Sequence, residues 1–126
     1  MPTYIVLNSD ASAITYTDLD YIANQLRATI SADRVPSAKQ LLPLPTQDSL
    51  QEVLLVVRGA EEQHVHNNDL VFYVLEGGGN VQLVSGEVVD APAGTTIAVP
   101  KGVSHAYFNT SPSDSVLIAT LSPATL

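Results

Sequence analysis

Three histidines are the residues of this chain whose type and spacing could do chemistry. His64 and His66 are separated by one residue, within a stretch, residues 63–66, that we expect to be a strand. Side chains two apart on a strand project from the same face, so both imidazoles could bind one metal ion at the usual Zn–N distance of roughly 2.0–2.1 Å. His105 lies in a second short patch, residues 100–105. In a β-rich chain, two such patches predict one site that the fold assembles.

The composition is that of one globular domain. The chain has 126 residues, of which 45% are hydrophobic and 14% charged, enough to bury a core. Its 13 acidic residues against five basic ones give a net charge of −8. Phosphate backbones and anionic lipid surfaces repel such a chain, so we expect neither nucleic acid nor membrane partners. Cysteine is absent, which excludes thiolate catalysis and cysteine-based zinc sites.

The N-terminal residues do not resemble a signal peptide. Residues 1–8 contain no basic side chain and only a short apolar run. No stretch of the chain approaches the ~20 apolar residues that span a bilayer. We therefore predict a cytoplasmic protein.

One amphipathic helix is expected near the N-terminus, over residues 18–31. Thr17 is its expected N-cap, and Asp20 follows three residues later in a weaker form of the capping box. The helix should end before Pro36, because the residue preceding a proline avoids helical angles. We expect its apolar stripe to pack on the outside of the following domain or on a second subunit. The stripe consists of Leu19, Ile22, Ala23, Leu26 and Ile30.

Short strands separated by turns follow from residue 38 onward. The run at residues 52–58 is apolar almost throughout, as in a strand that is covered on both faces. Strands this short and evenly spaced indicate an all-β sandwich or jelly-roll barrel. The expected strands are residues 40–44, 52–58, 63–66, 70–76, 81–84, 87–90, 95–99, 104–109 and 115–121.

Two spaced motifs carry a resemblance to a known family. The pattern G-x5-P-x-G-x2-H-x3-N is filled at every fixed place by Gly94, Pro100, Gly102, His105 and Asn109. The pattern G-x5-H-x-H-x3,4-E-x6-G precedes it, with one residue fewer than usual before the first histidine. Both motifs resemble those of the cupins, which are small jelly-roll barrels. The matching residues of the first motif are Gly59, His64, His66 and Gly77.

The resemblance implies a cupin jelly roll, a double-stranded β-helix barrel, over residues 38–122. Residues 1–37 would form an extension that contains the helix. Cupins commonly pair, so the resemblance also implies a homodimer, which light scattering would detect. The stripe of residues 18–31 and an expected strand at residues 4–7 offer a surface for it.

One place of the first motif differs from the family. The glutamate ligand falls at Leu70, which cannot bind metal. Asp69 is adjacent but should face away, because neighbours on a strand alternate between faces, unless a bulge turns it inward. The resemblance thus implies that His64, His66 and His105 hold a divalent transition metal (Fe, Zn, Ni, Mn or Cu) with positions open for substrate. Without protein charge, such a centre would favour an anionic or enolate-like substrate.

Strand alternation predicts further residues of the pocket. Tyr107 and Asn109 should share the face of His105. Tyr107 is the candidate catalytic group, as a hydrogen-bond donor or acid, and the alternative is a core aromatic whose hydroxyl is satisfied. Asn109 could contact substrate or tie down a loop, and Arg58 could bind a substrate carboxylate or be a solvated strand end. The residues expected to face the pocket from the preceding strand are Leu70, Phe72 and Val74.

These expectations leave two functions open, both acting on a small molecule. The first is a metal-dependent oxygenase or isomerase in which Tyr107 assists, by resemblance to three-histidine iron oxygenases of thiols or β-diketones. The second is a non-catalytic module that senses or stores a small ligand or metal. Beyond Tyr107, no inward-facing residue is expected to be ionisable, which keeps the second hypothesis open. A degenerate pocket without metal is the remaining alternative.

Overall fold

Short strands make up most of the chain, because β-branched and aromatic residues recur between turn residues along it. The computed structural model describes residues 2–7, 14–35, 37–45 and 49–123. In this part of the chain, no helix is long and apolar enough to span a membrane. The elements are β1 (Thr3–Leu7), β2 (Ile14–Asp18), α1 (Leu19–Arg27), β3 (Lys39–Leu44), β4 (Gln51–Val57), β5 (Asp69–Glu76), β6 (Gly78–Leu83), β7 (Val88–Pro92), β8 (Thr96–Val99), β9 (His105–Asn109) and β10 (Ser115–Ser122).

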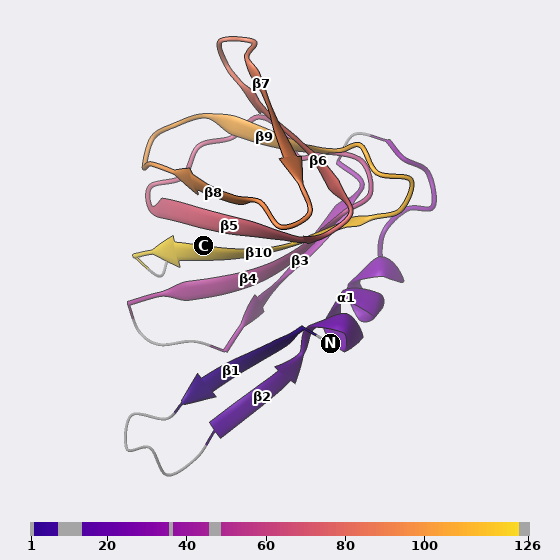
Figure 1. Cartoon of the computed structure of the whole chain (residues 1–126), viewed down its shortest axis with the longest axis vertical. Coiled ribbons are helices and arrows are strands. Elements are labelled where there is room, and N and C mark those ends of the chain that lie inside the picture. The colour runs from indigo at the N-terminus through magenta and orange to yellow at the C-terminus, as the bar shows by residue number, and fades with distance from the viewer. Residues whose placement is uncertain (1, 8–13, 36, 46–48, 124–126) are drawn as a thin grey trace.

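Two antiparallel sheets form the barrel (Figure 1). The strand orders are β3-β4-β10-β5-β8 and β7-β6-β9. The last strand, β10, lies between β4 and β5, so segments far apart in sequence are neighbours. This connectivity is that of a jelly roll and confirms the predicted all-β barrel. The expected strand at residues 63–66 is wrong, because this segment is a loop whose backbone pairs with β9 in an isolated bridge between His64 and His105.

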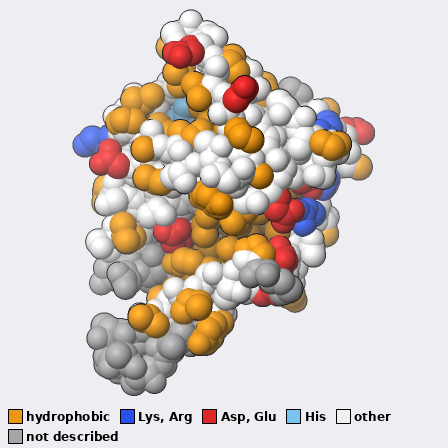
Figure 2. All heavy atoms as spheres, in the orientation of Figure 1, with side chains coloured by type: hydrophobic (Ala, Val, Ile, Leu, Met, Phe, Trp, Pro, Cys, Tyr) orange, Lys and Arg blue, Asp and Glu red, His pale blue; other side chains and the backbone are white. Residues whose placement is uncertain are grey.

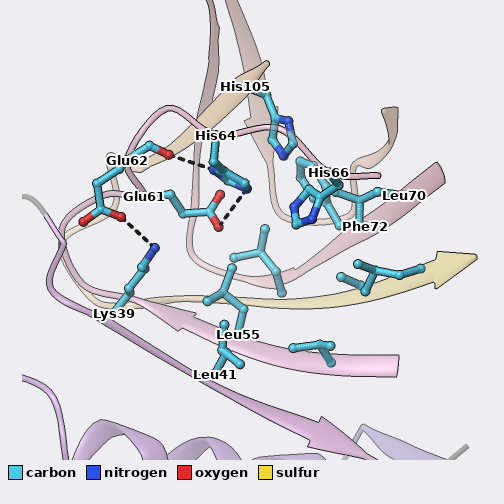
Figure 3. Close-up of a pocket in the computed structure, with 14 residues that line it drawn as sticks. Lys39, Leu41, Leu55, Glu61, Glu62, His64, His66, Leu70, Phe72 and His105 are labelled. Carbon is cyan, nitrogen blue, oxygen red and sulfur yellow. Dashed lines mark hydrogen bonds and ion pairs between the residues drawn. The ribbon is translucent and has the colours of Figure 1, made fainter. Parts of the chain in front are cut away.

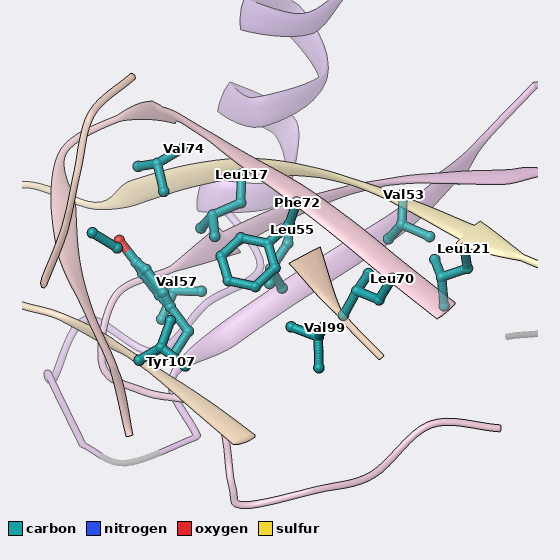
Figure 4. Packing of buried hydrophobic residues seen from close by; sticks show 12 residues of the cluster. Val53, Leu55, Val57, Leu70, Phe72, Val74, Val99, Tyr107, Leu117 and Leu121 are labelled. Carbon is teal, nitrogen blue, oxygen red and sulfur yellow. The ribbon is translucent and has the colours of Figure 1, made fainter. Parts of the chain in front are cut away.

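Apolar side chains that alternate along the strands fill the barrel interior (Figure 4). Strand β4 is buried on both faces. Its residues Leu54 and Val56 are 0% exposed and belong to a second cluster, outside the barrel, that includes residues of α1. The prediction that this strand is covered on both sides is therefore confirmed. The interior cluster consists of Val53, Leu55, Val57, Leu70, Phe72, Val74, Val81, Ala91, Val99, Tyr107, Leu117 and Leu121.

Helix α1 begins at a different cap from the one expected. The expected cap, Thr17, is wrong by one residue. The cap is Asp18, whose Oδ1 accepts hydrogen bonds from the amides of Asp20 (3.0 Å) and Tyr21 (3.3 Å). These bonds satisfy two of the amides that the first helical turn leaves without partners.

The same helix ends at Arg27, before the expected end at residue 31. The Thr29 hydroxyl donates to the Leu26 carbonyl at 2.8 Å, a local bond that competes with the helical ladder. Pro36, the expected reason for the helix end, lies outside the described residues. Leu19, Ala23 and Leu26 are buried against β4, which confirms that the stripe packs on the outside of the barrel.

The N-terminal strands β1 and β2 pair as a separate hairpin. The sequence pattern predicts only the first of them, because the interpretation of Thr17 as a helix cap takes precedence over the strand-forming residues 14–17. The hairpin lies at the lower end of Figure 1, and its residue Tyr4 packs against the cluster outside the barrel. Its side chains Ile5, Leu7 and Tyr16 are exposed, and hydrophobic atoms are visible on it in Figure 2.

Arg58, at the end of β4, links the segment after α1 to the barrel. Its guanidinium donates to both carboxylate oxygens of Asp114, at 2.9 and 3.0 Å. It also donates to the carbonyls of Ile30 (3.1 Å) and Ser31 (2.9 Å). Arg27 adds a second cation 3.4 Å from the Asp114 carboxylate. Arg58 is therefore neither a substrate-binding group nor a solvated strand end, and both sequence interpretations are wrong.

This cluster predicts a pH-dependent contribution to stability. The hydrogen bond from Arg58 is the main reason that the pKa of Asp114 lies below its usual value. A carboxylate with a lowered folded-state pKa stabilises the fold above its ordinary pKa of about 4, and this contribution disappears as the pH falls through the folded pKa. We expect Asp114→Asn to lower the free energy of unfolding by about 1–3 kcal/mol at pH 7.

Urea unfolding of both proteins at pH 7 and pH 3 checks this expectation, and the difference should shrink on acidification. Asp90→Asn, on an exposed position of β7, serves as the control and should change little. A difference between the native protein and Asp114→Asn that is the same at both pH values would contradict the proposed origin in the ionised pair.

Candidate metal centre

A loop between β4 and β5 carries two of the histidines across the barrel mouth. The amide of His64 donates to the His105 carbonyl at 3.0 Å, and the amide of His105 donates back to the His64 carbonyl at the same distance. The amide of Gly102 donates to the His66 carbonyl at 3.1 Å. Backbone hydrogen bonds to β9 and to the turn preceding it therefore hold the loop, without a regular strand.

The three imidazole rings gather in one place, as the sequence predicts. The ring centroid of His64 lies 4.8 Å from that of His66 and 4.3 Å from that of His105, and the centroids of His66 and His105 lie 5.5 Å apart. One nitrogen from each ring can be chosen so that all three lie within 4.8 Å of one another. Binding one ion with bonds of roughly 2.0–2.1 Å would require side-chain rotations that bring these nitrogens slightly closer together.

Hydrogen bonds to backbone carbonyls prepare two of the rings to bind a cation. The Nδ1 atom of His64 lies 2.7 Å from the Glu62 carbonyl, and that of His105 lies 3.0 Å from the Val103 carbonyl. A carbonyl only accepts hydrogen bonds, so Nδ1 carries the proton and the neutral ring keeps a free lone pair on Nε2. Carbonyl partners of this kind orient metal-bound histidines. The donor set therefore fits a divalent transition metal.

Burial also favours the neutral form of two rings. Removal from water lowers the pKa of His66, and the neighbouring imidazoles lower it further. Burial likewise lowers the pKa of His105, although its bond to the Val103 carbonyl acts in the opposite direction. Neutral imidazole is the form that binds metal.

The histidines border a cavity of about 220 Å³ with an apolar floor (Figure 3). Among the residues expected to face the pocket, Leu70 and Phe72 line it. Val74, on the same strand, is 0% exposed and belongs to the core instead. The polar residues of the lining, apart from the histidines, are Lys39, Glu61 and Glu62. Its apolar residues are Leu41, Val53, Leu55, Leu70, Phe72, Leu117, Ala119 and Leu121.

Tyr107 lies too deep in the barrel for its expected role as a catalytic group at the mouth. It is 1% exposed, and its hydroxyl donates to Ser115 Oγ at 2.9 Å. Two residues along a strand span roughly 6.6 Å, so sharing a face with His105 places Tyr107 inside the core instead of at the mouth. Burial raises the pKa of this phenol, which keeps its proton in place. The structure thus matches the alternative of an aromatic core residue with a satisfied hydroxyl.

Asn109 and Asp69 each hold a loop. The Asn109 amide donates to the carbonyls of Arg58 (3.0 Å) and Ser113 (2.8 Å), and it does not line the cavity. Asp69 is exposed, and its carboxylate accepts a hydrogen bond from the Lys101 amide at 3.0 Å. The Asn109 amide and the Asp69 carboxylate therefore form their hydrogen bonds away from the histidines.

Glu61 is a residue of the site that the sequence pattern does not predict. It lines the cavity with a side chain only 15% exposed, and its Oε2 lies 3.9 Å from His64 Nε2. The expectations of a site without protein charge and of no ionisable inward residue besides Tyr107 are therefore wrong. Alternation from His64 would place Glu61 outside, but residues 61–63 are not a strand, so that rule fails here.

Known proteins share this fold. A family model described as "Cupin domain" matches residues 51–121. An uncharacterized protein of Aquifex aeolicus (strain VF5) is 35% identical over 86 residues, covering 68% of this chain and 69% of that protein. The chain belongs to the cupin family.

Solved structures have the same architecture. An RmlC-like cupin from Shewanella frigidimarina NCIMB 400 is 26% identical, with a TM-score of 0.61 over 77% of this chain and 86% of the other. The polyketide cyclase RemF from Streptomyces resistomycificus is 20% identical, with a TM-score of 0.62 over 76% and 75% of the two chains. At that identity the second likeness concerns the fold alone.

Proposed function

We propose that the protein is a metal-dependent small-molecule enzyme, an oxygenase or isomerase, whose divalent transition metal is held by His64, His66 and His105. The observation that carries this proposal is the convergence of three imidazoles at an apolar cavity, two of them with Nδ1 bonded to a carbonyl. When bound, such a metal would activate dioxygen or polarise a carbonyl group. Imidazole suits iron, zinc, copper and nickel alike, so the donor set does not select among them.

The size and lining of the cavity favour a small ligand with an apolar body and one polar end. Ligand pockets for drug-sized molecules measure roughly 300–1,000 Å³, whereas this one measures about 220 Å³. The floor of Leu, Val, Phe and Ala side chains would exclude water around the apolar part. The polar end would then lie beside the histidines at the mouth (Figure 3). Figure 2 shows a histidine at the surface, and this is consistent with entry of a ligand from solvent.

A non-catalytic binding module is the second candidate function. Tyr107, the expected acid, has its hydroxyl bonded to Ser115 inside the core. Glu62 is directed toward Lys39, which lies 3.0 Å away, and its side chain is 63% exposed. Glu61 is then the carboxylate that remains beside the histidines, and a module that only stores or senses a ligand would need no further acid or base. A cytoplasmic location and a homodimer stay predictions.

Metal analysis of the purified protein, followed by turnover measurements after iron loading, separates these functions. Oxygen uptake is measured with a panel of diketones, thiols and flavonols, and isomerisation of the same compounds is followed by NMR. We expect one metal ion per chain and turnover of at least one panel member. Stoichiometric metal without turnover would favour the binding module, and protein that takes up no metal would contradict the metal-dependent enzyme.

A further inference from the structure

We propose that the Glu61 carboxylate is the fourth protein ligand of the metal site, an inference that rests on the proposed metal binding. Glu61 follows Ala60, which forms an isolated bridge with Phe108. The amide of Glu61 donates to the Tyr107 carbonyl at 2.8 Å. Strand β9 therefore fixes the backbone of Glu61 and also carries His105, so one strand holds both groups at the cavity.

The distances allow Glu61 and His64 to share one ion. Two ligand atoms on a common metal can be at most about 4.3 Å apart, twice the usual bond length. Glu61 Oε2 and His64 Nε2 are 3.9 Å apart, less than the 4.8 Å within which the three histidine nitrogens lie. The dashed line in Figure 3 marks this contact, with the carboxylate directed into the cavity.

The chemistry of the two facing atoms also favours a cation between them. With its Nδ1 proton donated to the Glu62 carbonyl, the neutral His64 ring presents a bare lone pair on Nε2. The Glu61 carboxylate oxygen that faces it is a second potential metal ligand, 3.9 Å away. A metal ion in this space would accept a lone pair from each of the two atoms.

The other nearby carboxylates are engaged elsewhere. Glu62 pairs with Lys39 at the rim, and Asp69 accepts the Lys101 amide on the opposite side of its strand. Glu61 would take the role of the glutamate that the family motif has at the position of Leu70. It would do so from the loop before the histidines. The bound site would then lose one unit of positive charge, and its attraction for anionic substrates would fall.

Metal titration of three variants tests this assignment without reference to activity. Glu61→Gln removes the charge, Glu61→Asp keeps the charge but shortens the side chain by a methylene, and Glu62→Gln is the matched control on the adjacent residue. Protein stripped with a chelator is titrated with Co²⁺ by calorimetry, and the visible spectrum of the Co²⁺ complex is recorded. Circular dichroism establishes that each variant is folded.

We expect Glu61→Gln to raise the Kd for Co²⁺ at least about 10–100-fold, the range known for residues that support a metal ligand. Glu61→Asp should lose affinity in the same way, because its carboxylate falls short of the ion. Both variants should change the Co²⁺ spectrum, and Glu62→Gln should change neither quantity.

Two results would overturn the assignment. In the first, Glu61→Gln binds Co²⁺ as tightly as the native protein, which leaves the three-histidine site intact but removes Glu61 from it. In the second, Glu61→Asp retains full affinity while Glu61→Gln does not, so that charge alone, without contact, explains the effect. Native protein that binds no Co²⁺ would instead overturn the proposed function.

Discussion

Replacement of His105 with alanine should reduce metal affinity at least about 100-fold, beyond the range seen for residues that only support a ligand. His105 is 2% exposed, and its Nδ1 bond to the Val103 carbonyl fixes the ring toward the other two histidines. Alanine removes one of three imidazole donors, and water in its place cannot be held in the same orientation. Metal content after dialysis and calorimetric titration measure the loss.

The fold should survive this substitution, because the two hydrogen bonds between His64 and His105 use backbone atoms. Gln63→Ala is the matched control, since Gln63 is an exposed neighbour of the site whose amide bonds to Ser104 Oγ. Its metal content should equal that of the native protein. Unchanged stoichiometry and affinity in His105→Ala would remove the assignment of the site to these histidines.

The second large effect is expected at Gly79, where β6 meets β9. Gly79 pairs with Asn109, and a Cβ atom at this position would lie 1.9 Å from the Phe108 carbonyl oxygen and 2.9 Å from the Tyr107 hydroxyl. The first of these is a backbone atom that cannot rotate away, so the two strands would have to separate. We expect Gly79→Ala to lower the free energy of unfolding by about 3 kcal/mol or more.

Urea denaturation measures this loss, with Gly86→Ala as the control. A Cβ atom at Gly86 would meet nothing within 4 Å, although its φ of +92° still makes a side chain unfavourable. The control should therefore cost only about 1–2 kcal/mol, from the left-handed conformation alone. Equal losses in the two variants would show that the close approach of β6 and β9 is not what requires glycine at residue 79.

Local patterns in the sequence predict the parts of this fold that depend on period and spacing. The apolar run of β4 predicts a strand buried on two faces, and both faces are covered, by the barrel interior and by α1. The glycine, proline and histidine spacing resembles the motifs of the cupins, and this resemblance implies the barrel and the gathering of the three imidazoles. The strand pattern follows from each residue's relation to its near neighbours, whereas the motif spacing is informative because it resembles that of a known family.

Predictions based on strand alternation fail where the backbone is irregular, and they do not give the depth of a side chain inside the barrel. Alternation extended through residues 61–66 would direct Glu61 outward, but this loop has no regular pleat, and the carboxylate enters the cavity. Strand alternation also places Tyr107 on the same strand face as His105, but it does not indicate that the Tyr107 hydroxyl lies inside the closed barrel. Arg58 pairs with Asp114, 56 residues away in sequence, and no local pattern connects them.

The sequence by itself determined the fold class, because strand periodicity is a local property of the chain, and it determined the three residues at the barrel mouth through the resemblance of its two motifs to those of the cupins. Only the tertiary structure decided which charged and polar groups surround those residues, bringing Glu61 to the histidines and placing Tyr107 in the core. The physical reason is that side-chain direction outside regular strands, and depth along a closed barrel, depend on backbone contacts between segments distant in sequence.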